Sequence, residues 1–143
     1  KQAPLISEEL KSNLLSNLDS LPSGNRLCHG DLHPNNIIAS PNGLIAIDWI
    51  DASIGNPLAD VARSTLLITL SELSGAMLLR RKMIAMMRNR FHHYYLEAYF
   101  AQQPQARREY QQWLPIVAAA RLVEGIENGQ KMLVDAITKW TAK

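Results

Sequence analysis

The sequence contains a single cysteine and no long apolar run. With Cys28 alone, an intrachain disulfide is excluded, and this cysteine usage is typical of a reducing compartment. No uninterrupted apolar stretch is long enough to span a bilayer, and the N-terminus has no signal-peptide pattern. We therefore expect a cytoplasmic protein with no membrane partner.

Charge of neither sign dominates, but the charges are unevenly distributed. Residues 1–60 carry three Lys or Arg against seven Asp or Glu, whereas residues 61–143 carry twelve against six. A basic half is one indication of nucleic-acid binding. The basic residues are not interleaved with aromatic residues on one surface, so solvated helix faces are the better interpretation. We expect no nucleic-acid partner.

Apolar residues at helical spacing predict that most of the chain is helical. A helix start is indicated by Ser7, which two acidic residues follow. The predicted helices cover residues 7–20, 58–73, 76–101, 105–114, 116–124 and 128–139. We expect boundaries at Pro115 and Gly125, and we expect the methionines 83, 86 and 87 to lie in the core.

A polar loop and a hairpin separate the first two predicted helices. Residues 26–29, 37–39 and 44–47 are strand-like, and the turn at 40–43 contains the Asn-Gly pair that favours a hairpin. The loop 29–36 reads His-Gly-Asp-Leu-His-Pro-Asn-Asn, and Asp48 follows the hairpin. The predicted fold class is therefore mainly α with a small β-hairpin.

The spacing of the polar residues in this loop indicates phosphoryl transfer. Four residues separate Asp31 from Asn36, as they separate the base from the metal-binding Asn in kinase catalytic loops. Phosphoryl transfer needs a carboxylate that orients the acceptor hydroxyl, and hard oxygen ligands for Mg²⁺. Asp31 is the candidate base, and Asn36 and Asp48 are the candidate Mg²⁺ ligands.

Three segments together resemble the aminoglycoside phosphotransferase and choline kinase family. They are the polar loop, the Ile-Asp-Trp at 47–49, and the Gly-Asn-Pro-Leu-Ala-Asp-Val-Ala at 55–62. The resemblance covers about residues 26–70 and implies a protein-kinase-like fold, with ATP as phosphate donor and Mg²⁺ as cofactor. It also implies that residues 1–143 form one domain, the C-terminal lobe, with the catalytic loop at about 26–50 and helices at 58–140.

The resemblance implies supporting roles around Asp31, which corresponds to the catalytic Asp of the family. His29 corresponds to the histidine that anchors the loop, and Asp60 to the helix residue that braces it through backbone amides. His33 would lie near the phosphates, where it either contacts the transferred phosphate or caps the loop. Asn56 stands where the family often has Asp.

Parts of a complete kinase are missing from the printed sequence. No glycine-rich phosphate loop precedes His29, and no strand Lys paired with a helix Glu is identifiable in residues 1–28. The sequence begins at Lys1 and not at Met. We expect that the N-terminal, ATP-covering lobe is absent from this chain and that the isolated chain is inactive.

The acceptor is predicted only as a class: a small molecule with a hydroxyl group. The resemblance implies an aminoglycoside, which would mean antibiotic resistance, an amino sugar, or an amino alcohol such as choline or ethanolamine. Such acceptors are cationic, so acidic residues should line their cleft. The first candidates are Asp51, Glu124 and Glu127, and Glu97 and Asp135 are others.

Two other classes of protein stay open. His29, Asp31 and His33 alternate in the loop, and imidazole with carboxylate is a ligand set for a metal-dependent hydrolase. However, the other two histidines, His92 and His93, lie in a helical stretch without partnered acids. The second alternative is a non-catalytic binding module, against which the intact base and Mg²⁺ ligands argue.

Overall fold

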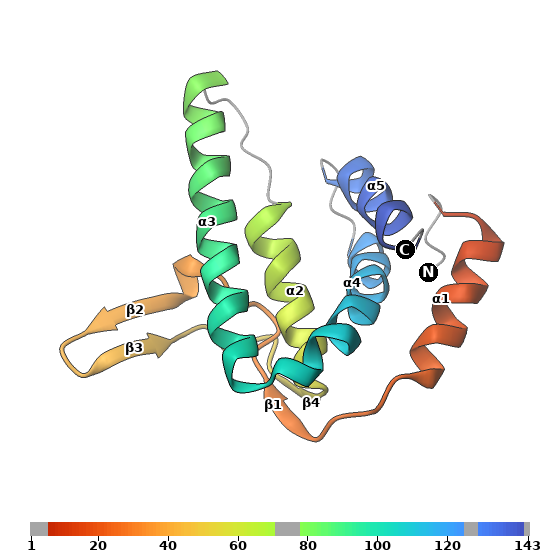
Figure 1. Ribbon diagram of the computed structural model, residues 1–143, viewed down its shortest axis with the longest axis horizontal. Helices are drawn as coiled ribbons and strands as arrows, with labels where there is room; N and C mark the ends of the chain where they lie inside the picture. The colour runs from red at the N-terminus through yellow and green to blue at the C-terminus, as the bar shows by residue number, and fades with distance from the viewer. Residues whose placement is uncertain (1–5, 71–77, 125–128, 142–143) are drawn as a thin grey trace.

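The computed structural model describes residues 6–70, 78–124 and 129–141. Its helices pack together, and two small two-stranded sheets lie beside them (Figure 1). In chain order, the elements are α1 (Glu8–Ser20), β1 (Arg26–Cys28), the 3₁₀ turn η1 (Pro34–Asn36), β2 (Ile37–Ser40), β3 (Gly43–Ala46), β4 (Ser53–Gly55), α2 (Pro57–Thr69), α3 (Leu78–Gln102), the 3₁₀ turn η2 (Pro104–Ala106), α4 (Arg107–Leu122) and α5 (Gln130–Thr141).

The two sheets position the polar loop. The β2–β3 hairpin forms as predicted, with Ser40 opposite Gly43, whose φ is +122°. Figure 1 shows this hairpin projecting away from α4 and α5. Strand β1 pairs antiparallel with β4, which places Leu27 opposite Ile54. The sequence patterns did not predict β4, because a three-residue strand has too little alternation to be recognised.

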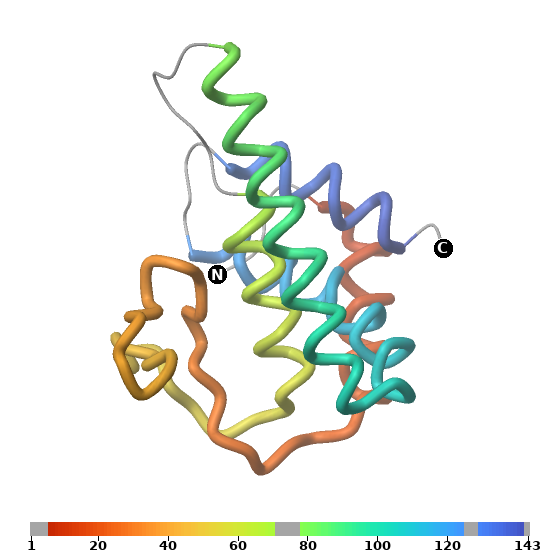
Figure 2. The backbone as a smooth tube through the Cα atoms, turned by 60° about the vertical axis from the view of Figure 1, so that its left-hand side comes forward, coloured from red at the N-terminus to blue at the C-terminus, as the bar shows by residue number. Residues whose placement is uncertain are grey.

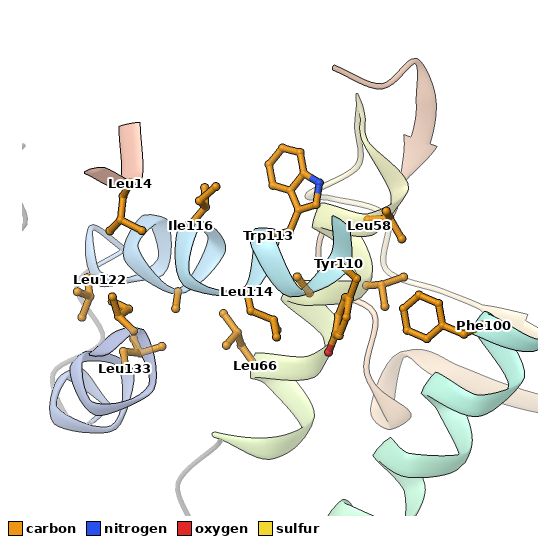
Figure 3. Packing of buried hydrophobic residues seen from close by; sticks show 14 residues of the cluster. Leu14, Leu58, Leu66, Phe100, Tyr110, Trp113, Leu114, Ile116, Leu122 and Leu133 are labelled. Carbon is orange, nitrogen blue, oxygen red and sulfur yellow. The ribbon is translucent and has the colours of Figure 1, made fainter. Parts of the chain in front are cut away.

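The hydrophobic core forms around α4, which packs against α1, α2 and α5 (Figure 3). Phe100, near the end of α3, closes the core on one side and meets the Tyr110 ring edge-on at a centroid distance of 5.3 Å. The buried cluster consists of Leu14, Leu58, Val61, Ala62, Leu66, Phe100, Tyr110, Trp113, Leu114, Ile116, Ala118, Leu122, Leu133 and Ile137. The start of α2, which holds the polar loop, is therefore anchored in the core.

Helix α4 runs without interruption through Pro115, so the predicted boundary at this residue is wrong. A proline inside a helix removes one backbone hydrogen bond and normally favours a kink or an end. Here Pro115 and its neighbours Leu114 and Ile116 are buried in the core, and their packing outweighs that cost. The second predicted boundary, at Gly125, lies outside the described residues.

The methionines of α3 are exposed, which contradicts the expectation that they lie in the core. Met83, Met86 and Met87 retain between 53% and 65% of their accessible surface. Figures 1 and 2 both show the N-terminal end of α3 extending beyond the end of α2, which is the described helix that α3 packs against. None of the described helices is both long and apolar enough to cross a membrane.

Asn56, which stands where the resemblance leads us to expect Asp, has a structural role of its own. Its Oδ1 accepts a hydrogen bond from Leu58 N at 2.9 Å and so caps α2, while Pro57 occupies the first turn. Its Nδ2 donates to Glu109 Oε1 at 2.8 Å and to Pro22 O at 2.9 Å. An Asp could cap the helix but could not donate to either acceptor.

Candidate functional site

The start of the polar loop is held by the first turn of α2. Asp60 accepts hydrogen bonds from two successive backbone amides, His29 N at its Oδ2 and Gly30 N at its Oδ1, both at 2.8 Å. Gly30 has a φ of +79°, and a Cβ at this position would lie 2.4 Å from the backbone oxygen of Asp51. The position therefore requires glycine, and the loop is fixed from two sides.

His29 connects the loop to the end of the hairpin. It is 3% exposed, its Nδ1 accepts from Asp31 N at 3.2 Å, and its Nε2 lies 2.9 Å from Ile47 O. An amide is a donor and a carbonyl is an acceptor, so a neutral ring with its proton on Nε2 satisfies both contacts. The Trp49 ring lies against the imidazole, with the centroids 4.5 Å apart. Neither ring nitrogen of His29 is left to bind a metal.

The Asp31 carboxylate is held by two residues of its own loop. Asn36 Nδ2 donates to Asp31 Oδ2 at 3.1 Å and to Asp31 O at 2.9 Å. His33 Nε2 lies 3.4 Å from the same Oδ2, and His33 Nδ1 accepts from Asn35 N at 3.2 Å. The Asp31 side chain is 31% exposed, and no donor of the described residues reaches its Oδ1. This oxygen is left free to accept a hydrogen bond.

Asn36 and Asp48 lie at the two adjoining ends of the hairpin. Ile47 N donates to Asn36 O at 3.0 Å, which brings Asp48, the next residue, beside Asn36. Both hydrogens of Asn36 Nδ2 point to Asp31, which leaves Oδ1 as its free acceptor. Asp48 is exposed, and its φ of +63° is the only positive φ of a non-glycine residue in the described ranges.

The side-chain oxygens of these two residues are of the kind that a hard cation prefers. A backbone in the left-handed region costs a residue such as Asp about 1–3 kcal/mol, and such strain is common at functional sites. One amide oxygen and one carboxylate are ligands that Mg²⁺ accepts, because it retains several waters or substrate oxygens. The donor set of Asn36 and Asp48 therefore fits Mg²⁺.

Two arginines that the sequence patterns did not identify lie beside Glu124, and one of them also contacts the loop. Arg63 Nε donates to Gly30 O, and its Nη1 pairs with Glu124 Oε1. Arg121 Nη1 pairs with Glu124 Oε2 at 3.1 Å. Arg63 follows Asp60 by three residues and so shares its helix face, which is the one signal in the sequence that could have identified it.

The other acids predicted for the acceptor cleft lie in different surroundings. Glu97 pairs with an arginine of α4 at 2.9 Å, and Asp135 with a lysine of α5 at 3.1 Å. Asp51 is exposed, and its backbone oxygen lies against Gly30 of the loop. Glu127 lies outside the described residues. Of the three acids that the structure describes, only Asp51 lies at the loop.

A family comparison identifies the kind of chain that this site belongs to. The model of the phosphotransferase enzyme family matches residues 2–114. The chain belongs to this family. The resemblance first drawn from residues 26–70 is thereby confirmed, and membership of the phosphotransferase enzyme family implies a kinase-type enzyme with a kinase-like fold. No curated protein and no solved structure matches the chain significantly.

The metal-hydrolase alternative finds no support in the geometry. Both ring nitrogens of His29 are used inside the loop, and His33 Nδ1 is occupied by Asn35 N. Within residues 6–70, 78–124 and 129–141, no three His, Cys, Asp or Glu side chains are grouped so that they could hold a metal ion. This alternative also has no place in the phosphotransferase enzyme family.

Proposed function

We propose that this chain is the catalytic half of an ATP- and Mg²⁺-dependent phosphotransferase. It transfers the γ-phosphate to a hydroxyl of a small molecule: an aminoglycoside, an amino sugar or an amino alcohol. The observation that carries the proposal is the Asp31 carboxylate, held by Asn36 and His33 on a loop whose backbone Asp60 fixes. Alternatively, the acceptor is choline, ethanolamine or another metabolite, and the chain belongs to a kinase of the same fold that acts on that metabolite.

Asp31 acts as the base in the proposed step. The acceptor hydroxyl donates its proton to the Asp31 carboxylate as its oxygen bonds to the γ-phosphorus. The bond from that phosphorus to the bridging oxygen breaks, and ADP leaves. His33, with Nε2 beside Asp31 Oδ2, is placed to donate either to that carboxylate or to a phosphate oxygen.

Asn36 and Asp48 hold the Mg²⁺ in this proposal. When bound, the cation neutralises negative charge on the phosphate oxygens of the nucleotide. The remaining contribution of the chain is to hold the two ligands: the Asn36 amide is oriented by Asp31, and Asp48 by its backbone next to Ile47. Phosphoryl transfer depends mainly on such positioning.

The surface around the Mg²⁺ ligands supports the proposal that another lobe covers ATP. Large apolar side chains are exposed on the β2–β3 hairpin and just after it, and exposed apolar side chains that lie together often mark a contact site. They are Ile38, Leu44, Ile45, Trp49 and Ile50. We propose that an N-terminal lobe outside this chain, together with the nucleotide, covers this hairpin.

The decisive experiment assays the full-length protein with MgATP and a panel of hydroxylated amines. Asp31→Asn should lower kcat by about 10²- to 10⁴-fold for any accepted substrate, because it removes the base. Nucleotide binding, followed by calorimetry, should change little. The matched control is Asp135→Asn on α5, which should retain full activity. Full activity of Asp31→Asn would overturn the assignment of the base.

A second assay tests whether the chain is sufficient on its own. Residues 1–143 should transfer no measurable phosphate from MgATP, because the printed sequence contains no glycine-rich loop to hold the phosphates. Transfer by this chain alone would contradict the proposal that another lobe is required, and would leave the role of Asp31 untouched.

A further inference from the structure

The peptide group between Gly30 and Asp31 is held at both of its polar atoms. Gly30 O accepts from Arg63 Nε, and Asp31 N donates to His29 Nδ1 at 3.2 Å. These two atoms belong to one planar unit, so holding both fixes the orientation of the plane. The direction in which the Asp31 side chain leaves the backbone therefore depends on Arg63.

The guanidinium of Arg63 links this peptide group to the end of α4. Besides the bond from Nε to Gly30, its Nη1 and Nη2 face the two carboxylate oxygens of Glu124, with the second contact at 3.4 Å. A guanidinium is a rigid plane, so the orientation that Glu124 imposes also sets the direction of Nε. A lysine has a single nitrogen and cannot reproduce this bridge.

Glu124 is held in turn by a second arginine. Arg121 Nη1 donates to Glu124 Oε2 at 3.1 Å, and the Arg63 and Arg121 side chains are only 22% and 20% exposed. The pKa of Arg121 is lowered, mainly by burial. Arg63 also lowers it, whereas the Glu124 and Asp31 carboxylates act in the opposite direction. Arg121 is therefore close enough to the Asp31 carboxylate for the two charges to interact.

We infer that Arg63, Glu124 and Arg121 form a positioning network that couples the C-terminal end of α4 to the peptide group preceding Asp31. Glu124 then serves the loop and not, as the sequence suggested, a cationic acceptor, because both of its oxygens are already paired with arginines. The inference rests on the proposed function, since placing Asp31 matters for rate only if Asp31 is the base.

The first test needs no catalysis and uses the 143-residue chain. Backbone amide NMR shifts are compared for Arg63→Met, Arg63→Lys, Glu124→Gln and the control Glu97→Gln, which breaks an ion pair between α3 and α4 instead. The first three variants should move the Asp31 amide resonance, and the control should not. An unmoved Asp31 amide in Glu124→Gln would overturn the coupling. Glu124→Gln therefore still tests the coupling if a substitution of Arg63 prevents folding.

The second test separates positioning from the base assignment in the full-length enzyme. Misplacing a reacting group by about 1 Å costs up to about 10²-fold in rate, so Arg63→Met and Glu124→Gln should lower kcat by about 10- to 100-fold. KM for ATP should stay within about threefold, because neither residue is proposed to bind nucleotide. Arg63→Lys should not rescue kcat; rescue would mean that charge alone suffices.

The two proposals fail in different ways. If Asp31→Asn is inactive while Arg63→Met and Glu124→Gln keep the wild-type kcat, the positioning network is wrong and the proposed function stands. If Asp31→Asn is fully active, the base assignment is wrong, whatever the amide shifts show.

Discussion

The loop-and-hairpin region, residues 29–55, and the helical core are held together by different interactions. In the loop, Asp60, His29 and Asn36 fix the backbone through individual hydrogen bonds of 2.8–3.2 Å. In the core, apolar side chains of α2, α4 and α5 are buried against one another, and Leu66 is 1% exposed. The hairpin beside the loop, in contrast, leaves large apolar side chains exposed to solvent.

This difference separates stability from function within one chain. Burial is non-directional and tolerates many sequences, whereas a hydrogen-bonded loop depends on particular donors and acceptors at particular places. We therefore expect substitutions in the core to act mainly on the free energy of unfolding. Substitutions in the loop should act mainly on the site, except where a side chain belongs to both regions.

The largest effect on stability is expected in the core. Leu66→Ala removes a side chain of α2 that is 1% exposed, and such truncations cost about 2–5 kcal/mol of unfolding free energy. Urea denaturation followed by circular dichroism measures the change. Leu79→Ala, at a residue that is 80% exposed, is the matched control and should change stability by less than about 0.5 kcal/mol. Equal losses in both variants would contradict the placement of the core.

Asp60 belongs to both regions and should show an intermediate effect. Asp60→Ala leaves the amides of His29 and Gly30 without their acceptor, which should cost about 1–3 kcal/mol. Faster amide hydrogen exchange at these two residues would show that the loss is local. Asp135→Ala, which removes only an exposed ion pair, should leave exchange in the loop unchanged.

A smaller effect is expected at Asn56, where the loop region joins α4. Asn56→Asp keeps the helix cap but removes the donor to Pro22 and places a carboxylate against Glu109, so we expect a loss of about 1 kcal/mol. Adding Glu109→Gln should recover part of the loss, because it restores a donor between the two side chains. No recovery in urea denaturation would mean that the contact with Glu109 is unimportant.

The smallest expected effect is a pH dependence of the free energy of unfolding, which comes from His92. Burial, and secondarily His93, lowers the pKa of His92, whose Nε2 lies 3.0 Å from Thr65 Oγ1. The unfolded chain, with a His pKa near its ordinary 6.5, then binds more protons than the folded chain. The contribution of His92 to the free energy of unfolding is therefore complete above the ordinary pKa. It declines as the pH falls toward the lowered pKa of the folded chain.

Urea denaturation at about pH 7.5 and about pH 5.5 tests this expectation. His92→Gln should reduce the loss of stability on acidification, whereas His93→Gln, at an exposed residue, should retain most of it. The same pH dependence in wild type and His92→Gln would contradict the assignment.

Much of this protein could be read from the sequence because the interactions concerned are local. The Ser7 cap of α1, the hairpin before Asp48 and the spacing from Asp31 to Asn36 each depend on residues close together in the chain. The family resemblance rests on the same short segments. Local hydrogen bonding and turn chemistry need no knowledge of distant parts of the chain.

Only the tertiary structure decided which side chains are buried or paired with residues far away in the sequence. Arg63 and Glu124 are 61 residues apart and meet only because α2 packs on α4, so the sequence could not show that this acid is paired with arginine. Core packing also carries α4 through Pro115, and the reach of α3 beyond α2 leaves Met83 exposed. Burial and pairing depend on contacts between distant segments, and these exist only once the helices have packed.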